Sequence, residues 1–151
     1  GGTTVGKGCK NLTPGELYLG TYDASAKAAS YTGMTFASRP SGLAFYYYYC
    51  VKNSADYGLV EVSVEDASGN VIASGSKNLS AAADYVLAEV PLEYAAGAAK
   101  AARIFVKFKS SGNSSCWAIN NDNLSSPSFG NLTSGRFTGS ELFVDDIVLK
   151  Y

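Results

Sequence analysis

Short stretches in which apolar and polar residues alternate recur along the whole chain, and turn residues separate them. The clearest is residues 59–65, Leu-Val-Glu-Val-Ser-Val-Glu, whose three valines share one face. A period of two is that of a β-strand with one buried face, because successive side chains point to opposite sides of a sheet. The Asp-Ala-Ser-Gly-Asn segment that follows has the composition of a hairpin loop. The pattern predicts strands over residues 16–22, 34–38, 43–51, 59–65, 71–76, 85–94, 104–109 and 142–151.

Three segments interrupt this regularity. Pro91 marks an edge position or a bulge, because proline cannot donate a hydrogen bond to a sheet. Residues 95–102 are rich in alanine and predict at most one helical turn, since Gly97 disfavours a longer helix. Residues 110–139 are rich in Ser, Asn and Gly, and a loop of that length is usually functional or contains short strands. With no βαβ alternation, the chain is expected to be all-β, an antiparallel two-sheet sandwich with jelly-roll topology.

Length and composition are those of one globular domain. The chain has 151 residues, of which 46% are hydrophobic, so a single sizeable core is feasible and disorder is excluded. Neither an internal repeat nor a linker divides it. We therefore expect one β-sandwich domain over residues 1–151.

Charge and residue usage exclude several classes of function. Twelve basic and thirteen acidic residues give a net charge of -1 with no basic run, so nucleic acid is not an expected partner. No apolar run reaches the roughly 20 residues of a transmembrane helix, and residues 1–10 lack the apolar core of a signal peptide. The chain has no histidine, which removes the commonest general base and zinc ligand. A non-enzymatic role is the expectation.

The three cysteines, Cys9, Cys50 and Cys116, are an odd number without C-x-x-C spacing. Free thiols are one interpretation, since free cysteine is commonly buried. A single disulfide with one thiol left over is the other.

The tyrosine run in residues 43–51 is the most unusual local feature. In a strand, Leu43, Phe45, Tyr47, Tyr49 and Val51 share one face, and this more apolar set is expected in the core. Tyr46 and Tyr48 then stand on the outer face, about 6.5–7 Å apart. Exposed rings with outward phenols suit the apolar faces of sugar rings, so the pair is a candidate glycan platform. Alternatively, the two rings only cover the sheet or contact another chain.

Three segments together resemble a known family. They are residues 15–22 (Gly-Glu-Leu-Tyr-Leu-Gly-Thr-Tyr), 36–45 (Phe-Ala-Ser-Arg-Pro-Ser-Gly-Leu-Ala-Phe) and 139–149 (Gly-Ser-Glu-Leu-Phe-Val-Asp-Asp-Ile-Val-Leu). The chain from Gly15 onward is similar to the carbohydrate metabolism domain of Bacteroidetes surface lipoproteins and to its sister domain of unknown function. This resemblance implies a jelly roll like that of galactose-binding and other carbohydrate-binding modules. It also implies an exported, cell-surface or periplasmic protein with glycans and neighbouring domains as partners.

The resemblance also implies a structural calcium near the last strand. In similar sandwich modules a terminal-strand aspartate often helps hold the ion, and Asp145 and Asp146 are the candidates here. Calcium takes six to eight oxygen ligands, to which Glu16 or Asp23 could contribute. Adjacent strand residues point to opposite faces, so both aspartates can bind one ion only at a bulge. Otherwise one aspartate caps a turn, and the other is exposed or paired with a base such as Arg39.

Two further side chains are candidates for ligand contact. Pro40 favours an extended Arg39, whose guanidinium either braces a loop or pairs with a carboxylate, or else contacts a ligand. Trp117, in the long polar segment, is either a hydrophobic plug or an exposed ring at a loop-end site.

These features support three hypotheses. The first is a non-catalytic carbohydrate-binding module of an exported bacterial surface protein. The second is a structural or adhesive module of a surface lipoprotein that has no sugar ligand. The third is a glycan-active enzyme, which needs two carboxylates about 5–10 Å apart across a cleft.

Overall fold

The computed structural model describes residues 14–26, 28–116 and 140–151, and this part of the chain is built from β-strands. All of the strand pairs in it are antiparallel, and it contains no α-helix, only a short 3-10 turn at Ser114–Cys116. The all-β prediction is confirmed. The strands are β1 (Glu16–Tyr18), β2 (Thr21–Asp23), β3 (Ala28–Ser30), β4 (Met34–Thr35), β5 (Gly42–Cys50), β6 (Gly58–Glu65), β7 (Val71–Leu79), β8 (Ala82–Pro91), β9 (Arg103–Lys109) and β10 (Glu141–Lys150).

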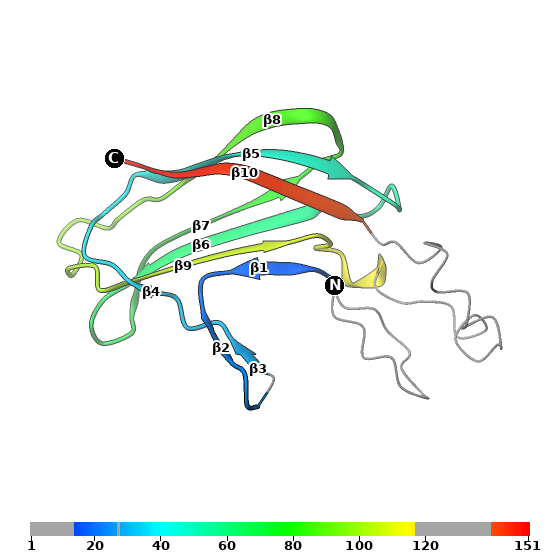
Figure 1. Cartoon of the computed structure of the whole chain (residues 1–151). Coiled ribbons are helices and arrows are strands. Elements are labelled where there is room, and N and C mark those ends of the chain that lie inside the picture. The colour runs from blue at the N-terminus through cyan, green and yellow to red at the C-terminus, as the bar shows by residue number, and fades with distance from the viewer. Residues whose placement is uncertain (1–13, 27, 117–139) are drawn as a thin grey trace.

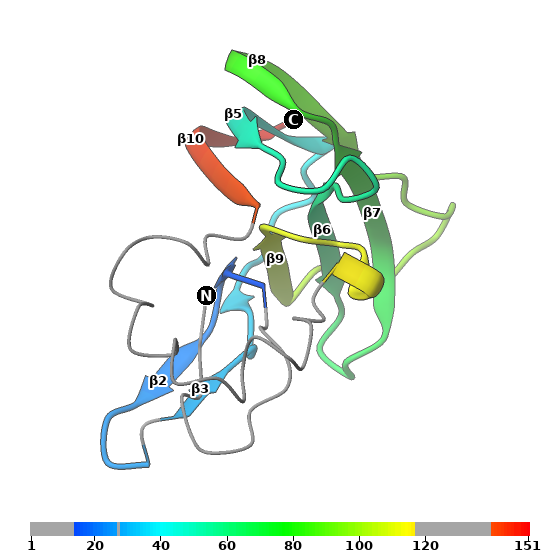
Figure 2. The same cartoon turned by 90° about the vertical axis from the view of Figure 1, so that its right-hand side faces the viewer.

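Two sheets face each other. The larger has the order β1-β9-β6-β7, with β4 also paired to β9, and the smaller has the order β10-β5-β8. Figures 1 and 2 show them as two layers, with β5, β8 and β10 in one and β1, β6, β7 and β9 in the other. The core lies between the layers and draws residues from both. This arrangement fits a β-sandwich.

The alternation seen in the sequence explains the core. Val60, Val62 and Val64 of β6 are at most 2% exposed, and the residues between them are half-buried. On the facing strand β5, Phe45 is fully buried, and its ring meets that of Phe108 on β9 edge to face at 5.0 Å. Burying a side chain of this size stabilises the fold by roughly 2–3 kcal/mol. The same alternation in β5 and β6 therefore supplies buried side chains to the core from both sheets.

The N-terminal part differs from its prediction. Residues 16–22 form two strands rather than one, and β2 pairs with β3 in a hairpin that projects from the larger sheet (Figure 1). The carboxylate of Asp23 accepts hydrogen bonds from the backbone N–H groups of Ser25 and Ala26, at 2.8 and 3.0 Å, and so closes the hairpin turn. The polar and alanine-rich sequence of this hairpin has no clear period, which is why it was not predicted.

Other boundaries change less. The strand predicted over 34–38 shortens to β4, β7 is three residues longer than predicted, and β8 begins and ends three residues earlier than the predicted strand 85–94. Pro91 is the last residue of β8, an edge strand, as expected for a residue without an N–H. The alanine-rich segment contains a turn instead of a helical turn: the Ala98 N–H donates to the Ala95 carbonyl, and Gly97 has a φ of +75°.

At one end of the molecule, the Asp56 carboxylate connects three segments of the chain through hydrogen bonds. Its Oδ1 accepts a hydrogen bond from the Ser111 hydroxyl at 2.7 Å, and its Oδ2 accepts one from the Ser140 hydroxyl, also at 2.7 Å. The N–H of Tyr57 also donates to Oδ1, at 2.9 Å. The connection between β5 and β6 is thereby tied to the residues that follow β9 and to the residue that precedes β10.

We predict that Asp56→Ala lowers the free energy of unfolding by about 2–3 kcal/mol, because it leaves several partly buried donors without an acceptor. Chemical denaturation measures the change. Asp84→Ala, at an exposed position on β8, is the matched control and should change stability little. Equal effects of the two variants would contradict a fastening role for Asp56.

Tyr49 is held at the same end. It is 1% exposed, its hydroxyl donates to the Ser110 carbonyl at 3.0 Å, and burial raises its pKa to about 12. In the unfolded chain the phenol ionises near pH 10, so alkaline pH favours the unfolded state.

We therefore predict that stability falls between pH 10 and pH 12, and that Tyr49→Phe makes this fall shallower. Denaturation at several alkaline pH values measures the slope for both proteins. A variant with the same slope as the wild type would show that Tyr49 does not contribute to it.

Candidate functional site

The outer face of the smaller sheet carries a cluster of exposed aromatic and aliphatic side chains. Tyr48 of β5 lies at its centre, with its ring centroid 6.2 Å from that of Tyr85 on β8 and 5.6 Å from that of Phe143 on β10. The three rings form a row across all three strands. We call the aromatic face the surface made by Tyr46, Tyr48, Tyr85, Leu87 and Phe143.

Strand register builds this row. Phe143 is the cross-strand partner of Tyr48, and a register shift between Tyr47 and Tyr49 accompanies the approach of Tyr85 from the other side. Side chains that are direct neighbours across antiparallel strands lie about 4.5–5.5 Å apart at Cβ, close enough for rings to touch.

The predicted alternation along β5 is confirmed. Phe45, Tyr47 and Tyr49 are buried, whereas Tyr46 is 41% exposed and Tyr48, between its two aromatic neighbours, is half-buried. Ala44 is the exception on the outer face, with 5% exposure. Its cross-strand neighbours are Glu89 and Val148.

Charged groups border the aromatic face on two sides. Asp145 is the cross-strand partner of Tyr46, and its carboxylate is exposed. Further along the sheet, Lys150 of β10 and Glu89 of β8 form an ion pair at 2.7 Å across β5. The face thus combines flat apolar surface with hydrogen-bonding groups at its margin.

The sequence indicated Tyr46 and Tyr48 but missed Tyr85, Leu87 and Phe143. The alternation in the last strand places Phe143 opposite to the inward Leu142 and Val144, so that signal was available. Tyr85 and Leu87 join the face only because β8 pairs with β5, and no local pattern specifies which strands pair.

The two aspartates of β10 lie at a bulge. The register with β5 shifts between Asp145 and Val148, and Asp146 has a φ of +49°, a conformation that aspartate tolerates better than most residues. The bulge that a shared ion would require is therefore present.

The two other candidate calcium ligands, Glu16 and Asp23, have other partners. Asp145 accepts a hydrogen bond from the N–H of Asp146 at 2.8 Å. Glu16 lies 3.9 Å from the amine of Lys107, and Asp23 closes its own turn. No group of three or more acidic, Cys or His side chains with metal-ligand spacing occurs among the described residues. Two carboxylates do not supply the six to eight oxygens of a calcium site, so calcium binding stays a prediction.

Calcium at the bulge predicts that excess chelator lowers the melting temperature by several degrees, because an ion bound only to the folded state stabilises it. The double variant Asp145→Asn/Asp146→Asn should then melt at one temperature with or without chelator. Differential scanning calorimetry of both proteins makes the comparison. An unchanged wild-type melting temperature argues against the ion.

Arg39 braces a loop instead of joining the aromatic face. It lies before β5 begins, and its guanidinium carbon is 4.3 Å from the ring centroid of Tyr94, which follows β8. Such a cation–π contact is worth about 0.5–1 kcal/mol at an exposed site. Trp117 lies outside the described residues.

The described cysteines are free thiols. Cys50, at the end of β5, is exposed, and Cys116 is half-buried. Burial raises the pKa of the Cys116 thiol, and the nearby Asp56 carboxylate adds to the effect. Cys9 lies outside the described residues.

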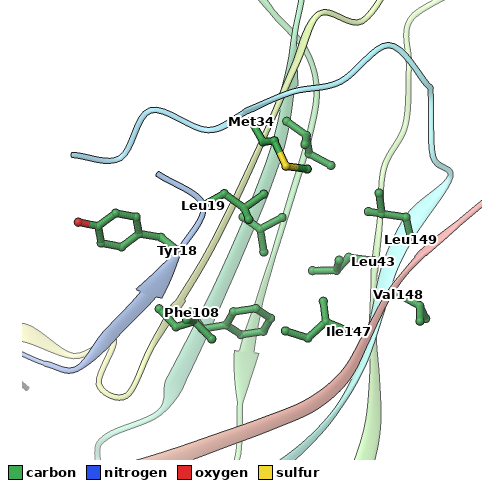
Figure 3. A pocket seen from close by; sticks show the side chains of 11 residues that line it. Tyr18, Leu19, Met34, Leu43, Phe108, Ile147, Val148 and Leu149 are labelled. Carbon is green, nitrogen blue, oxygen red and sulfur yellow. The ribbon is translucent and has the colours of Figure 1, made fainter. Parts of the chain in front are cut away.

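A second feature is an apolar slot between the two sheets. It has a volume of about 230 Å³ and is lined by Leu17, Tyr18, Leu19, Met34, Leu43, Ile104, Val106, Phe108, Ile147, Val148 and Leu149. Figure 3 shows Leu43 and Ile147 from the smaller sheet facing Phe108 from the larger sheet and Leu19, which follows β1, with the ring of Tyr18 pointing away. Almost no polar surface lines the slot, and no carboxylate does. It therefore does not meet the requirement of a glycosidase cleft.

Comparison of the chain with protein-family models, with curated proteins and with solved structures finds no match. The described residues also include no helix with the length and hydropathy needed to cross a membrane.

Proposed function

We propose that this chain is a non-catalytic carbohydrate-binding module of an exported bacterial surface protein, with the aromatic face as its glycan site. A jelly-roll fold related to that of other carbohydrate-binding modules is part of this proposal. The resemblance of residues 15–22, 36–45 and 139–149 to a family of surface lipoproteins supports both parts.

The observation that carries the proposal is the row formed by Tyr85, Tyr48 and Phe143. Tyr85 and Phe143 are 53% and 47% exposed, so both rings offer surface to a ligand while Tyr48 holds them together. Large apolar surface in solvent is unfavourable and normally has a partner. The C–H faces of pyranose rings are flat and apolar, and successive sugars along a chain suit a row of rings.

Polar groups at the margin supply orientation. The phenol hydroxyls of Tyr46 and Tyr85 can donate and accept hydrogen bonds, and the exposed carboxylate of Asp145 can accept them from sugar hydroxyls. Hydrogen bonds to a charged acceptor are stronger than neutral ones, so Asp145 is the expected determinant of orientation.

A second candidate function rests on the aliphatic part of the same surface. Leu87 is 55% exposed and lies beside Tyr46, and Val148 is exposed to the same extent further along β10. Aliphatic side chains contribute little to sugar binding but are common in contacts between domains. They favour a structural or adhesive module that packs on a neighbouring domain.

The test is a glycan array probed with the wild-type chain and with the double variant Tyr46→Ala/Tyr48→Ala. We expect the wild type to bind a subset of glycans, and the variant to bind them at least about tenfold more weakly, since each lost ring removes stacking surface. Tyr22→Ala removes a tyrosine that is 66% exposed on the distant hairpin and should bind like the wild type.

Tyr85→Ala and Tyr85→Phe refine the result. If Tyr85→Ala loses glycan binding and Tyr85→Phe retains it, Tyr85 contributes by ring stacking. If both variants lose glycan binding, the hydroxyl of Tyr85 is required. Circular dichroism establishes that each variant is folded. Absence of binding across plant, host and microbial glycans contradicts the proposal and favours the domain-packing function.

A further inference from the structure

A groove follows the edge of β10 that has no paired strand among the described residues, and it extends along most of β10. The apolar slot adjoins β10 at Ile147 and Leu149, and a second groove of about the same volume, 230 Å³, adjoins it at Leu142 and Val144. The two share Leu17 of β1 and Phe108 of β9 in their linings. They therefore form consecutive parts of one depression beside residues 142–149. At a rise of about 3.3 Å per residue, an extended segment of about eight residues would span it.

The strands on either side leave room for a further strand. β10 is at the edge of its sheet, and within the described part of the chain only β5 pairs with it. On the opposite side of the depression, the larger sheet ends in two short pieces, β1 with three residues and β4 with two. A long edge strand presents unpaired N–H and C=O groups to which another chain can add.

The bulge turns an apolar side chain of β10 into the slot, where it could contact side chains of an added strand. The extra residue at Asp146 changes the alternation of β10, so that Ile147 points into the slot toward Leu43 and Phe108 (Figure 3). A strand paired to β10 would direct every second side chain at this apolar lining. At 230 Å³ the slot exceeds the cavity of about 150 Å³ that holds a benzene ring, so it accommodates aliphatic side chains.

The charged side chains beside the depression indicate the composition of the segment that would bind there. Asp145 and Asp146 are exposed at the bulge, and neither has an ion-pair partner in the part of the chain that the structure describes. Glu16 lines the other part of the depression but lies 3.9 Å from the Lys107 amine, so the two aspartates carry the unpaired charge among the described residues. Opposite charges that meet at an interface favour association and fix its register. A segment with lysine or arginine on its solvent-facing positions would complement these carboxylates.

We propose that the free edge of β10 and the groove beneath it form a docking site for an extended segment of another polypeptide, in which apolar residues alternate with basic ones. The site lies at the sheet edge and has only Asp145 in common with the margin of the aromatic face.

The test uses a synthetic peptide of about eight residues in which valine and lysine alternate, with capped ends, titrated into the whole chain in the presence of chelator. We expect saturable binding by calorimetry with one peptide per chain. A second peptide has glutamate in place of each lysine, and a third has the composition of the first with its valines grouped together. Both should bind at least about tenfold more weakly, because they lack charge complementarity and alternation, respectively.

Variants of the protein locate the site. Leu17→Ser/Ile147→Ser removes apolar lining at two exposed positions and should weaken binding by about tenfold. Asp145→Asn/Asp146→Asn keeps side-chain size and should reduce the preference for the lysine peptide. Val71→Ser, at a similarly exposed position on β7, is the matched control and should bind like the wild type.

Hydrogen exchange distinguishes strand addition from other contacts. Bound peptide should slow exchange of amides in β10 and leave the edge strand β8 unchanged. Equal binding of all three peptides, protection elsewhere, or no binding would overturn the proposal. A dimer in light scattering that Leu17→Ser/Ile147→Ser dissociates would also overturn it, because the occupant would then be a second copy of the chain.

Discussion

The two faces of β5 impose the constraint on which the rest of the structure depends. One set of alternating residues, Phe45, Tyr47 and Tyr49, is buried and packs against the larger sheet. The other set places Tyr46 and Tyr48 outside. A shift of one residue would exchange the two sets, so the register that secures the core also presents the aromatic face. Stability and the candidate glycan site are therefore two results of one alternation.

The candidate sites differ in how the fold produces them. The aromatic face lies over the middle of a sheet, where neighbouring strands on both sides hold Tyr48 in place. The groove beside β10 lies where the described sheets stop and backbone groups are available. A sheet face binds through side chains alone, whereas an edge adds main-chain hydrogen bonds. Two binding surfaces of different chemistry can thus coexist on one small sandwich.

The sequence predicted structural features that depend on a single strand, and it missed features that depend on how several strands pair. The valines of β6 and the tyrosines of β5 predicted their own buried and exposed faces, because the period of two is a local property. The row through Tyr85 and Phe143 depends on partners far apart in the chain. The groove depends on a bulge at Asp146, which the sequence raised only as a condition for a shared calcium ion, and the hairpin of β2 and β3 had no periodic signal. Function remains a proposal because neither pattern nor fold identifies a ligand.

The pairing of β5 with β10 has a consequence for how the chain folds. Leu43 pairs with Leu149 near the opposite end of the sequence, whereas β6 and β7 are joined by a short turn. Contacts between residues so distant close a long loop, and such topologies fold slowly. Until β10 arrives, β5 has an open edge beside its tyrosines. During synthesis this edge is exposed for longer than any hairpin edge, so we expect premature association of nascent chains to begin at residues 42–50.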